Sequence, residues 1–396
     1  MVTASIGATR APSPTHRWWA VPLVVASFAI ITGLLVVSVL PASVRATNAD
    51  SVPTPYALVP ASAEDVAPLI SFDAVPRHPA SGELMFVTIR EPKISLLDSW
   101  LAKPLPEVSF LTREQRYGTQ TPSQQQQANI QMMRTAQQTA EYVALHHLGY
   151  PAEIVPGEVI INQILCLKAS ADGQTCAEPA PADELLDPGD TLREVDGSAL
   201  STIDDLGPVL ARHKVGDSVH VKFERPGKGK QEGDVTLIAS NDGTNRAIIG
   251  FQPVDTATAK LPFEVTIRTE AIGGPSAGLA FTLTLIDELT PGELTGKNRI
   301  AVTGTINADG TVGAIGGLNA KTSAVKQAGA KVFIVPSEQG HDPDNPDSIE
   351  TAKKVAGNDL IIVDVKNLDE ALAALAKYGG NSGSLGQPGA DYKPTT

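Results

Sequence analysis

One uninterrupted apolar stretch constrains this chain more than any other feature. From Trp18 to Leu40 the sequence reads WWAVPLVVASFAIITGLLVVSVL and holds no charged residue. A helix of roughly 20 apolar residues is long enough to cross the hydrocarbon core of a bilayer. The stretch therefore predicts one transmembrane helix at residues 18–40, with a short part of the chain before it and a long part after it.

The charges that flank this stretch indicate its orientation. Arg10, His16 and Arg17 precede it, and the first charged residue after it is Arg45. Cationic residues beside a span stay in the cytoplasm. We expect residues 1–17 to be a cytoplasmic tail and the rest of the chain to lie outside, on a single-pass protein of the cell membrane.

A cleaved signal peptide is the alternative to an anchor. The small residues around Arg45, in Val44-Arg45-Ala46, could form a cleavage site. The apolar region of a signal peptide is normally only about 7 to 15 residues long, however, and this one is longer. The length of the stretch favours an anchor that is retained.

Composition excludes several classes of partner. The formal net charge is -13 and the pI is near 5.0, so the chain lacks the basic character of a nucleic-acid-binding protein. The nearest candidate for a phosphate-binding loop, GELTGKN at Gly292–Asn298, has the wrong spacing and no hydroxyl after its lysine. The sequence predicts no nucleotide, no other cofactor and no metal.

The chain has two cysteines, Cys166 and Cys176. Between them lies ADGQT, which can form a turn, and both cysteines fall in the part predicted to be outside the membrane. Thiols in an oxidising compartment commonly pair, so we expect a short local disulfide. Two separate buried thiols remain the alternative.

Composition and periodicity divide the outer part into segments that differ in character. They are a small-residue and proline-rich linker at 41–60, an α+β segment at 61–150 with a helix near Gln125–His147, a β-rich segment at 151–240, an α/β domain at 241–377 that opens with the strand AIIGFQPV, and a Gly/Ser/Pro-rich disordered tail at 378–396.

The β-rich segment resembles a PDZ domain. LLDPGDTLREVDG, at Leu185–Gly197, nearly matches the signature L-x-x-G-D-x-I-x-x-V-[ND]-G, and a short helix and paired strands follow. Upstream, such domains carry a carboxylate-binding loop. The corresponding segment here, VPGEVIINQILCLKASADGQTC, has no clear match to that loop. The resemblance implies peptide binding, either of a free C-terminus or of an internal segment by strand addition at the edge of the sheet.

A lone serine, Ser276, precedes the apolar run AGLAFTLTLI within EAIGGPSAGLAFTLTLIDEL. Glycines, a proline and a serine before such a run predict a helix N-terminus. Unpaired backbone N–H groups and a positive dipole at that end could stabilise an oxyanion. Serine as a simple N-cap is the alternative.

A second residue makes a catalytic interpretation specific. In GGLNAKTSAVKQAGAK, Lys321 lies on the apolar stripe of a predicted helix, between Leu318 and Val325. Burial lowers the pKa of a lysine and leaves a neutral amine that can accept a proton. Ser276 and Lys321 therefore form a candidate nucleophile and general base that needs no histidine.

These two motifs resemble the proteolytic domain of Lon proteases. GPSAG with Ser276, TGTI with Thr303 and GTVGAIGGLNAK with Lys321, followed by AGAKVFIVP, carry the likeness. With a membrane anchor and a PDZ-like module, but no ATPase part, the chain looks like the membrane-anchored PDZ and Lon-domain serine proteases of Gram-positive bacteria. The resemblance implies that Ser276 is the nucleophile, Lys321 the base and Thr303 the residue that orients the amine, and it suggests a homo-oligomeric ring, a hexamer.

Further expectations concern the surroundings of Ser276. The N–H of Ser276 or Ala277 should face the oxyanion, and Gly273 and Gly274 should leave room for a substrate that lies along the strand FEVTIRT. Many Lon proteases have an acidic residue where Gly273 or Gly274 stands here. Tuning of the pair by that carboxylate is therefore either absent here or supplied from elsewhere.

Two other interpretations stay open. GPSAG also fits G-x-S-x-G of the α/β-hydrolases, but the only downstream histidine is His341, in a polar loop whose Asp342, Asp344 and Asp347 give a hint of calcium. A peptide-binding or chaperone-like protein with a degenerate Lon-like domain is the non-enzyme alternative. The sequence favours an ATP-independent serine endopeptidase that acts on proteins or peptides outside the membrane.

Overall fold

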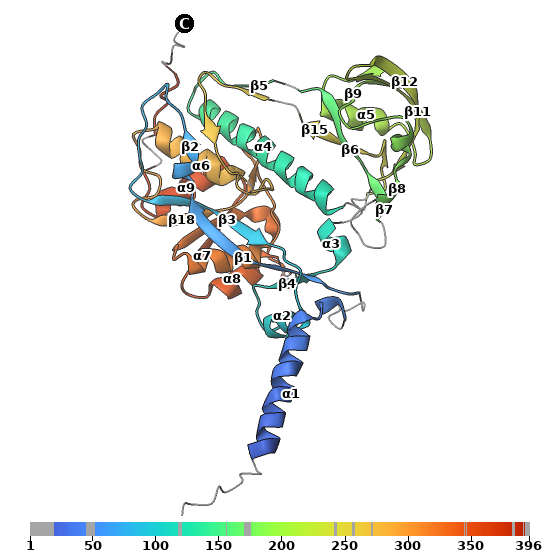
Figure 1. Ribbon diagram of the computed structural model, residues 1–396. Helices are drawn as coiled ribbons and strands as arrows, with labels where there is room; N and C mark the ends of the chain where they lie inside the picture. Colours follow the sequence, from blue (N-terminus) through green and yellow to red (C-terminus); the bar gives the residue numbers. More distant parts are fainter. Residues whose placement is uncertain are drawn as a thin grey trace, which may run out of the picture.

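The computed structural model describes most of the chain (Figure 1). The described residues are 20–44, 52–117, 121–155, 157–169, 176–240, 244–255, 258–270, 272–343, 345, 347–381, 385–390 and 392. The predicted cytoplasmic tail, Trp18 with Trp19, the candidate cleavage site around Arg45, and Asp344 lie outside these residues.

Helix α1 (Ala20–Val39) corresponds to the apolar stretch and projects from one end of the molecule (Figure 1). It is long and apolar enough to cross a membrane, and its side chains are largely exposed. A helix that is apolar on every side and packs on no core is suited to lipid. It is the one such helix among the described residues.

A mixed sheet forms the centre of the main body. Its order is β22-β21-β18-β3-β1-β4, and the pairs among β22, β21, β18 and β3 are parallel, whereas β1 is antiparallel to both β3 and β4. The strands are β1 (Tyr56–Asp65), β3 (Glu83–Arg90), β4 (Ser109–Leu111), β18 (Arg299–Val302), β21 (Val332–Pro336) and β22 (Ile361–Val365).

Helices cover both faces of this sheet (Figure 1). Side chains alternate along β3, as they do along any strand. Leu84 and Phe86 join a core with α4, α6 and α9, whereas Met85 and Val87 join a second core with α7 and α8. The helices are α4 (Pro122–His147), α6 (Gly278–Leu289), α7 (Leu318–Gln327), α8 (Ile349–Ala356) and α9 (Leu368–Lys377).

The main body is built from two separate parts of the sequence. Strands β1 and β3 and helix α4 come from the N-terminal segment. Both strands join the central sheet, and β3 and α4 share one core with the α/β elements after residue 260. The predicted linker at 41–60 is wrong for its last part, because β1 begins at Tyr56 and Ala57 is buried. The helix predicted near Gln125–His147 is confirmed as α4, and its Met133, Ala140 and Ala144 are buried.

Smaller elements complete the main body. They are β2 (Ile70–Ser71), paired with β17 (Thr266–Ile267), then α2 (Leu96–Ala102), α3 (Arg113–Tyr117), and the hairpin of β19 (Thr305–Ile306) and β20 (Val312–Gly313).

A separate β-rich unit is inserted between α4 and α6, and we call residues 157–255 the β domain. Its sheet has the order β12-β11-β9-β6-β15 and its own apolar core. Strands β5 (Glu153–Val155) and β16 (Thr258–Lys260) pair with each other where the chain leaves and re-enters the main body. The elements are β6 (Val159–Ile164), β7 (Cys166–Ala169), β8 (Cys176–Pro179), β9 (Thr191–Val195), β10 (Ser198–Ala199), α5 (Leu206–Leu210), β11 (Ser218–Arg225), β12 (Gly229–Thr236), β13 (Ile238–Ala239), β14 (Ala247–Ile248) and β15 (Phe251–Asp255).

The segment AIIGFQPV lies in the β domain, not in the α/β domain that it was expected to open. Strand β15 pairs antiparallel with β6, and β14 pairs with β13. An apolar run bounded by turns does not reveal its partner strand, which explains the difference. The β domain therefore extends past residue 240.

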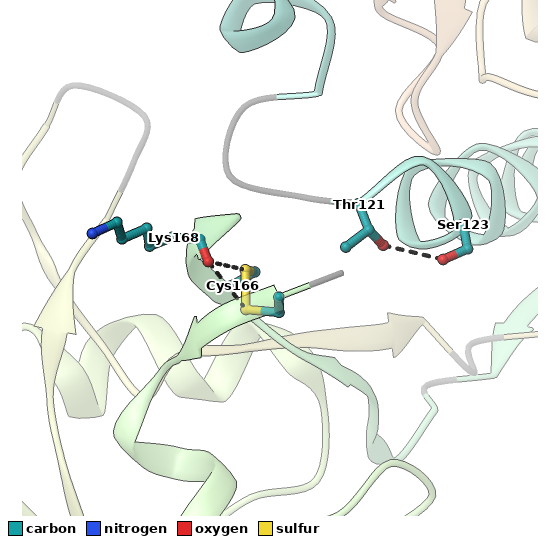
Figure 2. The surroundings of a disulfide bond; sticks show 5 residues. Thr121, Ser123, Cys166 and Lys168 are labelled. Carbon is teal, nitrogen blue, oxygen red and sulfur yellow. Dashed lines mark hydrogen bonds between the residues drawn. A yellow bond between two sulfur atoms is a disulfide. The ribbon is translucent and has the colours of Figure 1, made fainter. Parts of the chain in front are cut away.

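Cys166 and Cys176 are joined in a disulfide that links β7 to β8 (Figure 2). Both sulfur atoms lie near the Lys168 carbonyl oxygen, at 3.2 and 3.7 Å. Figure 2 also shows the hydroxyls of Thr121 and Ser123, at the start of α4, within 3.1 Å of each other.

The C-terminal segment packs on the main body where the structure describes it, so the prediction of a disordered tail is wrong there. Leu385 is buried in the main core. The ring of Tyr392 lies edge-on to those of Tyr150 and Phe263, and the Gly389 N–H donates to the Leu148 carbonyl at 3.0 Å. Gly, Ser and Pro enrichment does not exclude packing when a few apolar residues are placed among them.

Candidate active site

Ser276 lies in the turn that leads into α6. Its carbonyl accepts hydrogen bonds from the Gly304 N–H at 2.9 Å and from the Thr303 hydroxyl at 3.2 Å, and the Leu279 N–H donates to the Gly304 carbonyl at 3.1 Å. The segment after β18 therefore fixes the backbone of the turn on both sides of Ser276.

The apolar run after Ser276 forms helix α6. Every residue of α6 is buried, so the helix is held on all sides by the core. The first helical residue is Gly278 and the N-cap position is Ala277, which has no side-chain oxygen. Ser276 therefore does not occupy the N-cap position, and the alternative that it serves only as a helix cap is wrong.

Lys321 lies on α7, and only 2% of its side-chain surface is exposed. Its Nζ is 2.6 Å from Ser276 Oγ and 3.1 Å from Thr303 Oγ1. The structure thus brings Ser276, Lys321 and Thr303 together from three elements that are distant in the sequence.

Burial lowers the pKa of Lys321 to about 7, because a charged amine loses its hydration inside the protein. The nearby Asp347 carboxylate acts in the opposite direction. Among the described residues, no carboxylate forms an ion pair with this amine. A substantial fraction of Lys321 is therefore neutral near pH 7, and the neutral amine can accept the Ser276 proton.

Asp347 holds the start of α7. Its carboxylate accepts a hydrogen bond from the Gly317 N–H at 2.8 Å and another from the Leu318 N–H. Gly317 has a φ of +74°, a backbone conformation that favours glycine, and a Cβ there would also lie 2.8 Å from a Leu58 methyl group of β1. The aspartate belongs to the loop with the hint of calcium, but no group of metal ligands is present within the described part of that loop or elsewhere in the described residues.

Asp347→Asn should shift the rising limb of the pH–activity profile to lower pH. The carboxylate raises the pKa of Lys321, so its removal leaves burial unopposed and lowers that pKa below about 7. Initial rates on a peptide substrate across a pH series measure the shift. Glu350→Gln, which neutralises an exposed carboxylate paired with Lys353, is the control and should leave the limb in place. An unmoved limb in Asp347→Asn would contradict this role.

The glycines before Ser276 have different functions. Gly274 has a φ of +89° and its N–H donates to the Asn129 carbonyl of α4 at 2.8 Å, while a Cβ on it would meet open space. A Cβ on Gly273 would lie 2.8 Å from the Asn129 Cβ. A side chain at Gly273 would therefore clash with α4. Only Gly274 borders open space, where a substrate backbone can lie.

Backbone donors lie beside the serine. Among the described residues, neither the Ser276 N–H nor the Ala277 N–H has a hydrogen-bond acceptor. Unpaired N–H groups at the start of a buried helix can stabilise a negatively charged oxygen. Both groups are available for the role expected of them.

Ser276 and Lys321 open into a cleft of about 1160 Å³. Its walls combine apolar and polar side chains from β3, the start of α4, the turn before α6 and the loop Ala314–Gly316. Ala61 and Ser62 reach it from an irregularity in β1, where the register with β3 shifts. The cleft is large enough for several residues of an extended peptide.

The strand FEVTIRT, expected to line the substrate site, does not line this cleft. Phe263, Val265 and Ile267 face the main core, and β17 is paired with β2. The apolar alternation of this segment indicated burial correctly. Its position depends on pairing with β2, a segment distant in the sequence, and periodicity does not report such a partner.

His341 is not among the residues that line the cleft. It is exposed and lies 3.2 Å from Glu350 on α8. A nucleophile elbow requires a histidine within reach of the serine, and here Lys321 occupies that place. The geometry favours the lysine interpretation of GPSAG.

The sequence did not reveal Asp347 as the carboxylate whose charge acts on Lys321. It also did not reveal the contribution of α4 to the cleft. Asn129, Ile130 and Met133 line the cleft from α4. The helix near Gln125–His147 was predicted, but the position of its first turns beside the cleft was not. The acidic character of the loop before α8 was the available signal for Asp347.

A second groove, of about 970 Å³, lies in the β domain between α5 and the segment from Asn245 to Pro253. Strand β15 is the edge strand of the sheet on this side. A groove between a helix and a free strand edge can accept an extended peptide as a further strand. The sequence placed this segment in the wrong domain and therefore missed the groove.

Thr303→Val should lower activity without abolishing it. Its hydroxyl contacts both the Lys321 amine and the Ser276 carbonyl, and loss of a hydrogen bond to a buried ionisable group costs about 1.5–3 kcal/mol, a loss of roughly 10- to 100-fold in rate. Steady-state kinetics on a peptide test this. Thr303→Ser, which keeps the hydroxyl, should retain most of the rate, and equal losses in the two variants would contradict the role.

Comparison with known proteins supports the assignment of this domain. Residues 267–377 match the model of the Lon protease (S16) C-terminal proteolytic domain. The chain is 39% identical over 106 residues to a Lon protease of Trichlorobacter lovleyi, covering 26% of this chain and 12% of that protein. It is 36% identical over 99 residues to a Lon protease of Buchnera aphidicola, covering 25% and 12%. The chain thus spans only about 12% of the length of these relatives.

The chain is also similar to solved structures of PDZ domains. The chain is similar to the PDZ domain of an SdrC-like protein from Listeria monocytogenes, with 24% identity and a TM-score of 0.20, over 26% of this chain and 93% of that one. The family match covers residues 267–377, and this segment carries both Ser276 and Lys321. The chain therefore contains a Lon-type (S16) C-terminal proteolytic domain at residues 267–377.

Proposed function

We propose that this protein is a serine endopeptidase that works without ATP, with Ser276 as the nucleophile and Lys321 as the general base. The observation that carries the proposal is the 2.6 Å contact between the serine hydroxyl and a buried amine whose pKa is lowered to about 7. A hydroxyl beside a neutral amine, with N–H donors close by, is sufficient for acyl transfer.

The reaction uses the same amine in both directions. An N–H of Lys321 donates to Thr303 Oγ1, which leaves the lone pair of the amine directed at the Ser276 hydroxyl. The amine takes the hydroxyl proton as Oγ attacks the substrate carbonyl, and the Ser276 or Ala277 N–H stabilises the oxyanion. The protonated amine then gives its proton to the leaving nitrogen, and a water activated by the same amine hydrolyses the acyl-enzyme.

The substrate is an extended segment of a protein or peptide. The turn before Ser276 and the loop Ala314–Gly316 border the cleft, and they leave space for a backbone beside the hydroxyl.

The protein works outside the cytoplasmic membrane and is held there by α1. The uncharged length of α1 and the cationic residues before it support this topology. The disulfide in the β domain is consistent with an oxidising compartment. On the resemblance to Lon proteases alone, we also propose a homo-oligomeric ring, a hexamer.

Cleavage of an unfolded protein by the purified full chain in detergent, with and without ATP, tests the activity. We expect the same rate in both conditions. Absence of cleavage in every assembly state would favour the alternative, a peptide-binding or chaperone-like protein with a degenerate proteolytic domain.

We also propose that the β domain presents or gates substrates without taking part in the chemistry. Thr258 pairs with Val155 at the base of the insertion, so a two-residue Asn-Gly turn can replace residues 156–257. This deletion should lower cleavage of a protein substrate by about tenfold or more, since a tethered site raises the local substrate concentration, and should spare a short chromogenic peptide. Parallel kinetics on the two substrates measure the difference.

A point variant tests the groove without removing the β domain. Gly207 lines the groove, and a Cβ on it would meet no other atom within 4 Å. Gly207→Phe should therefore fill the groove while the domain stays folded, and should reproduce the selective loss. Equal losses on the protein and the peptide in both variants would overturn the gating role.

A further inference from the structure

Three large apolar side chains are exposed together on α2 and the turn after it. The exposed fractions are 70% for Trp100, 56% for Leu101 and 43% for Leu105. We call these three residues the apolar patch. Single exposed apolar residues are common on soluble surfaces, but a cluster that includes an indole marks a surface that is covered in the working protein.

The patch lies beside the end of α1. The Leu96 N–H donates to the Leu40 carbonyl at 2.8 Å, and the Ala42 N–H donates to the Ile94 carbonyl at 3.0 Å. Figure 1 shows α2 next to the end of α1 from which the main body emerges, and the two helices are in contact. The patch therefore continues the apolar surface of α1 at the level where that helix leaves its span.

The orientation of α2 is fixed. Ser95 and Asp98 form a capping box, with the Ser95 N–H donating to the Asp98 carboxylate at 2.9 Å and the Asp98 N–H donating to Ser95 Oγ at 3.1 Å. Such a box satisfies two otherwise unpaired donors and stabilises the first turn of a helix. The apolar patch is held in place on a rigid support.

We propose that the apolar patch is a membrane-docking surface, inserted in the interfacial layer of the outer leaflet beside α1. Its occupant is lipid, at the boundary between headgroups and acyl chains. This inference rests on the proposal that α1 spans the membrane. Indole rings favour this layer because they are apolar with one polar N–H, and the exposed Lys103 can extend its ammonium to the headgroups.

Docking at a second point would set the orientation of the main body. One helix alone lets the body rotate and tilt, whereas a patch on a rigid support restricts both motions. Glu91, which lines the catalytic cleft, lies a few residues before Ser95, so the cleft is held near the membrane surface. Protein segments close to the membrane are then the substrates within reach.

Tryptophan fluorescence in vesicles tests this placement. The chain has three tryptophans, so Trp18→Phe with Trp19→Phe leaves Trp100 as the only indole in the full-length protein. In phosphatidylcholine vesicles that contain lipid brominated near the headgroup end of its chains, Trp100 should lose roughly half or more of its emission, as expected for burial at the headgroup boundary. Iodide in the buffer should quench it weakly.

A second protein with its single tryptophan far from α1, and an alkaline wash of the vesicles, distinguish the possible outcomes. In a protein with all three native indoles replaced by phenylalanine, Val215→Trp places the reporter at an exposed site of the β domain, far from α1 in Figure 1, and brominated lipid should not quench it. If Trp100 resists both brominated lipid and iodide, another protein copy covers the patch and the lipid assignment is wrong. If iodide quenches Trp100 freely, nothing covers it and the assignment is again wrong. Loss of the protein from vesicles in an alkaline wash would overturn the anchor as well.

Discussion

Ser276→Ala should lower kcat on any peptide substrate by roughly 10⁴- to 10⁶-fold, the range of losses seen when the nucleophile of a serine protease is removed. The substitution removes one oxygen that contacts the Lys321 amine, and it leaves the backbone bonds of the turn to Gly304 unchanged. Rates with a chromogenic peptide at several enzyme concentrations measure the loss.

The fold of this variant should be preserved. Ala277, not Ser276, occupies the N-cap position of α6, so no helix cap is lost, and the thermal unfolding midpoint should stay close to that of the parent. His341→Ala is the control, because the only histidine after Ser276 is exposed and pairs with Glu350. Full loss in His341→Ala with activity retained in Lys321→Arg would revive the nucleophile-elbow interpretation.

Lys321→Arg should be about as inactive as Ser276→Ala. A guanidinium stays protonated at every working pH, so it cannot take the serine proton even though it keeps the positive charge. Lys321→Met tests the same point with a neutral side chain of similar length, which suits a site where only 2% of the lysine is exposed. Single-turnover and steady-state assays on one peptide measure both variants.

The neighbouring Lys326 provides the control for this prediction. It lies on the same helix, its side chain is partly exposed, and it pairs with Asp359 at the surface. Lys326→Arg should therefore keep near-normal activity. Activity in Lys321→Met that approaches the parent value would show that another base serves Ser276.

The pair itself could be predicted from the sequence because its signals are local. Lys321 interrupts an apolar helical stripe, and Ser276 stands at the entry to an apolar run, so each residue carries evidence of its surroundings. The structure brings the two within 2.6 Å. Burial of the lysine follows from the periodicity of α7, and its lowered pKa follows from burial.

The partners of the strands could not be predicted in the same way. Tyr56–Pro60 was assigned to a linker and Phe251–Asp255 to the α/β domain, although the first joins the central sheet and the second joins the β domain. Pairing depends on contacts between segments that are distant in sequence, and periodicity does not report them. The walls of the cleft were missed for the same reason, since α4 and β1 reach Ser276 only through the fold.

The role of Asp347 also could not be predicted from the sequence. The sequence raised the question of whether a carboxylate tunes the pair, because Gly273 or Gly274 stands where many Lon proteases have an acidic residue. The structure places Asp347 at the first turn of α7, bound to the Gly317 and Leu318 N–H groups, and near the Lys321 amine. A loop residue bound to backbone groups leaves no periodic signal in the sequence.

The pH dependence of acylation at Ser276 tests the central claim most directly. An activated peptide ester is mixed with the full chain in detergent without ATP, the reaction is quenched with acid, and the acyl adduct is located and quantified by mass spectrometry. We predict an adduct on Ser276 whose rate of formation rises with pH through an apparent pKa near 7, because only the neutral Lys321 accepts the proton, and a rising limb that is absent from Lys321→Met. An adduct on another residue, or an unchanged limb in Lys321→Met, would contradict the account.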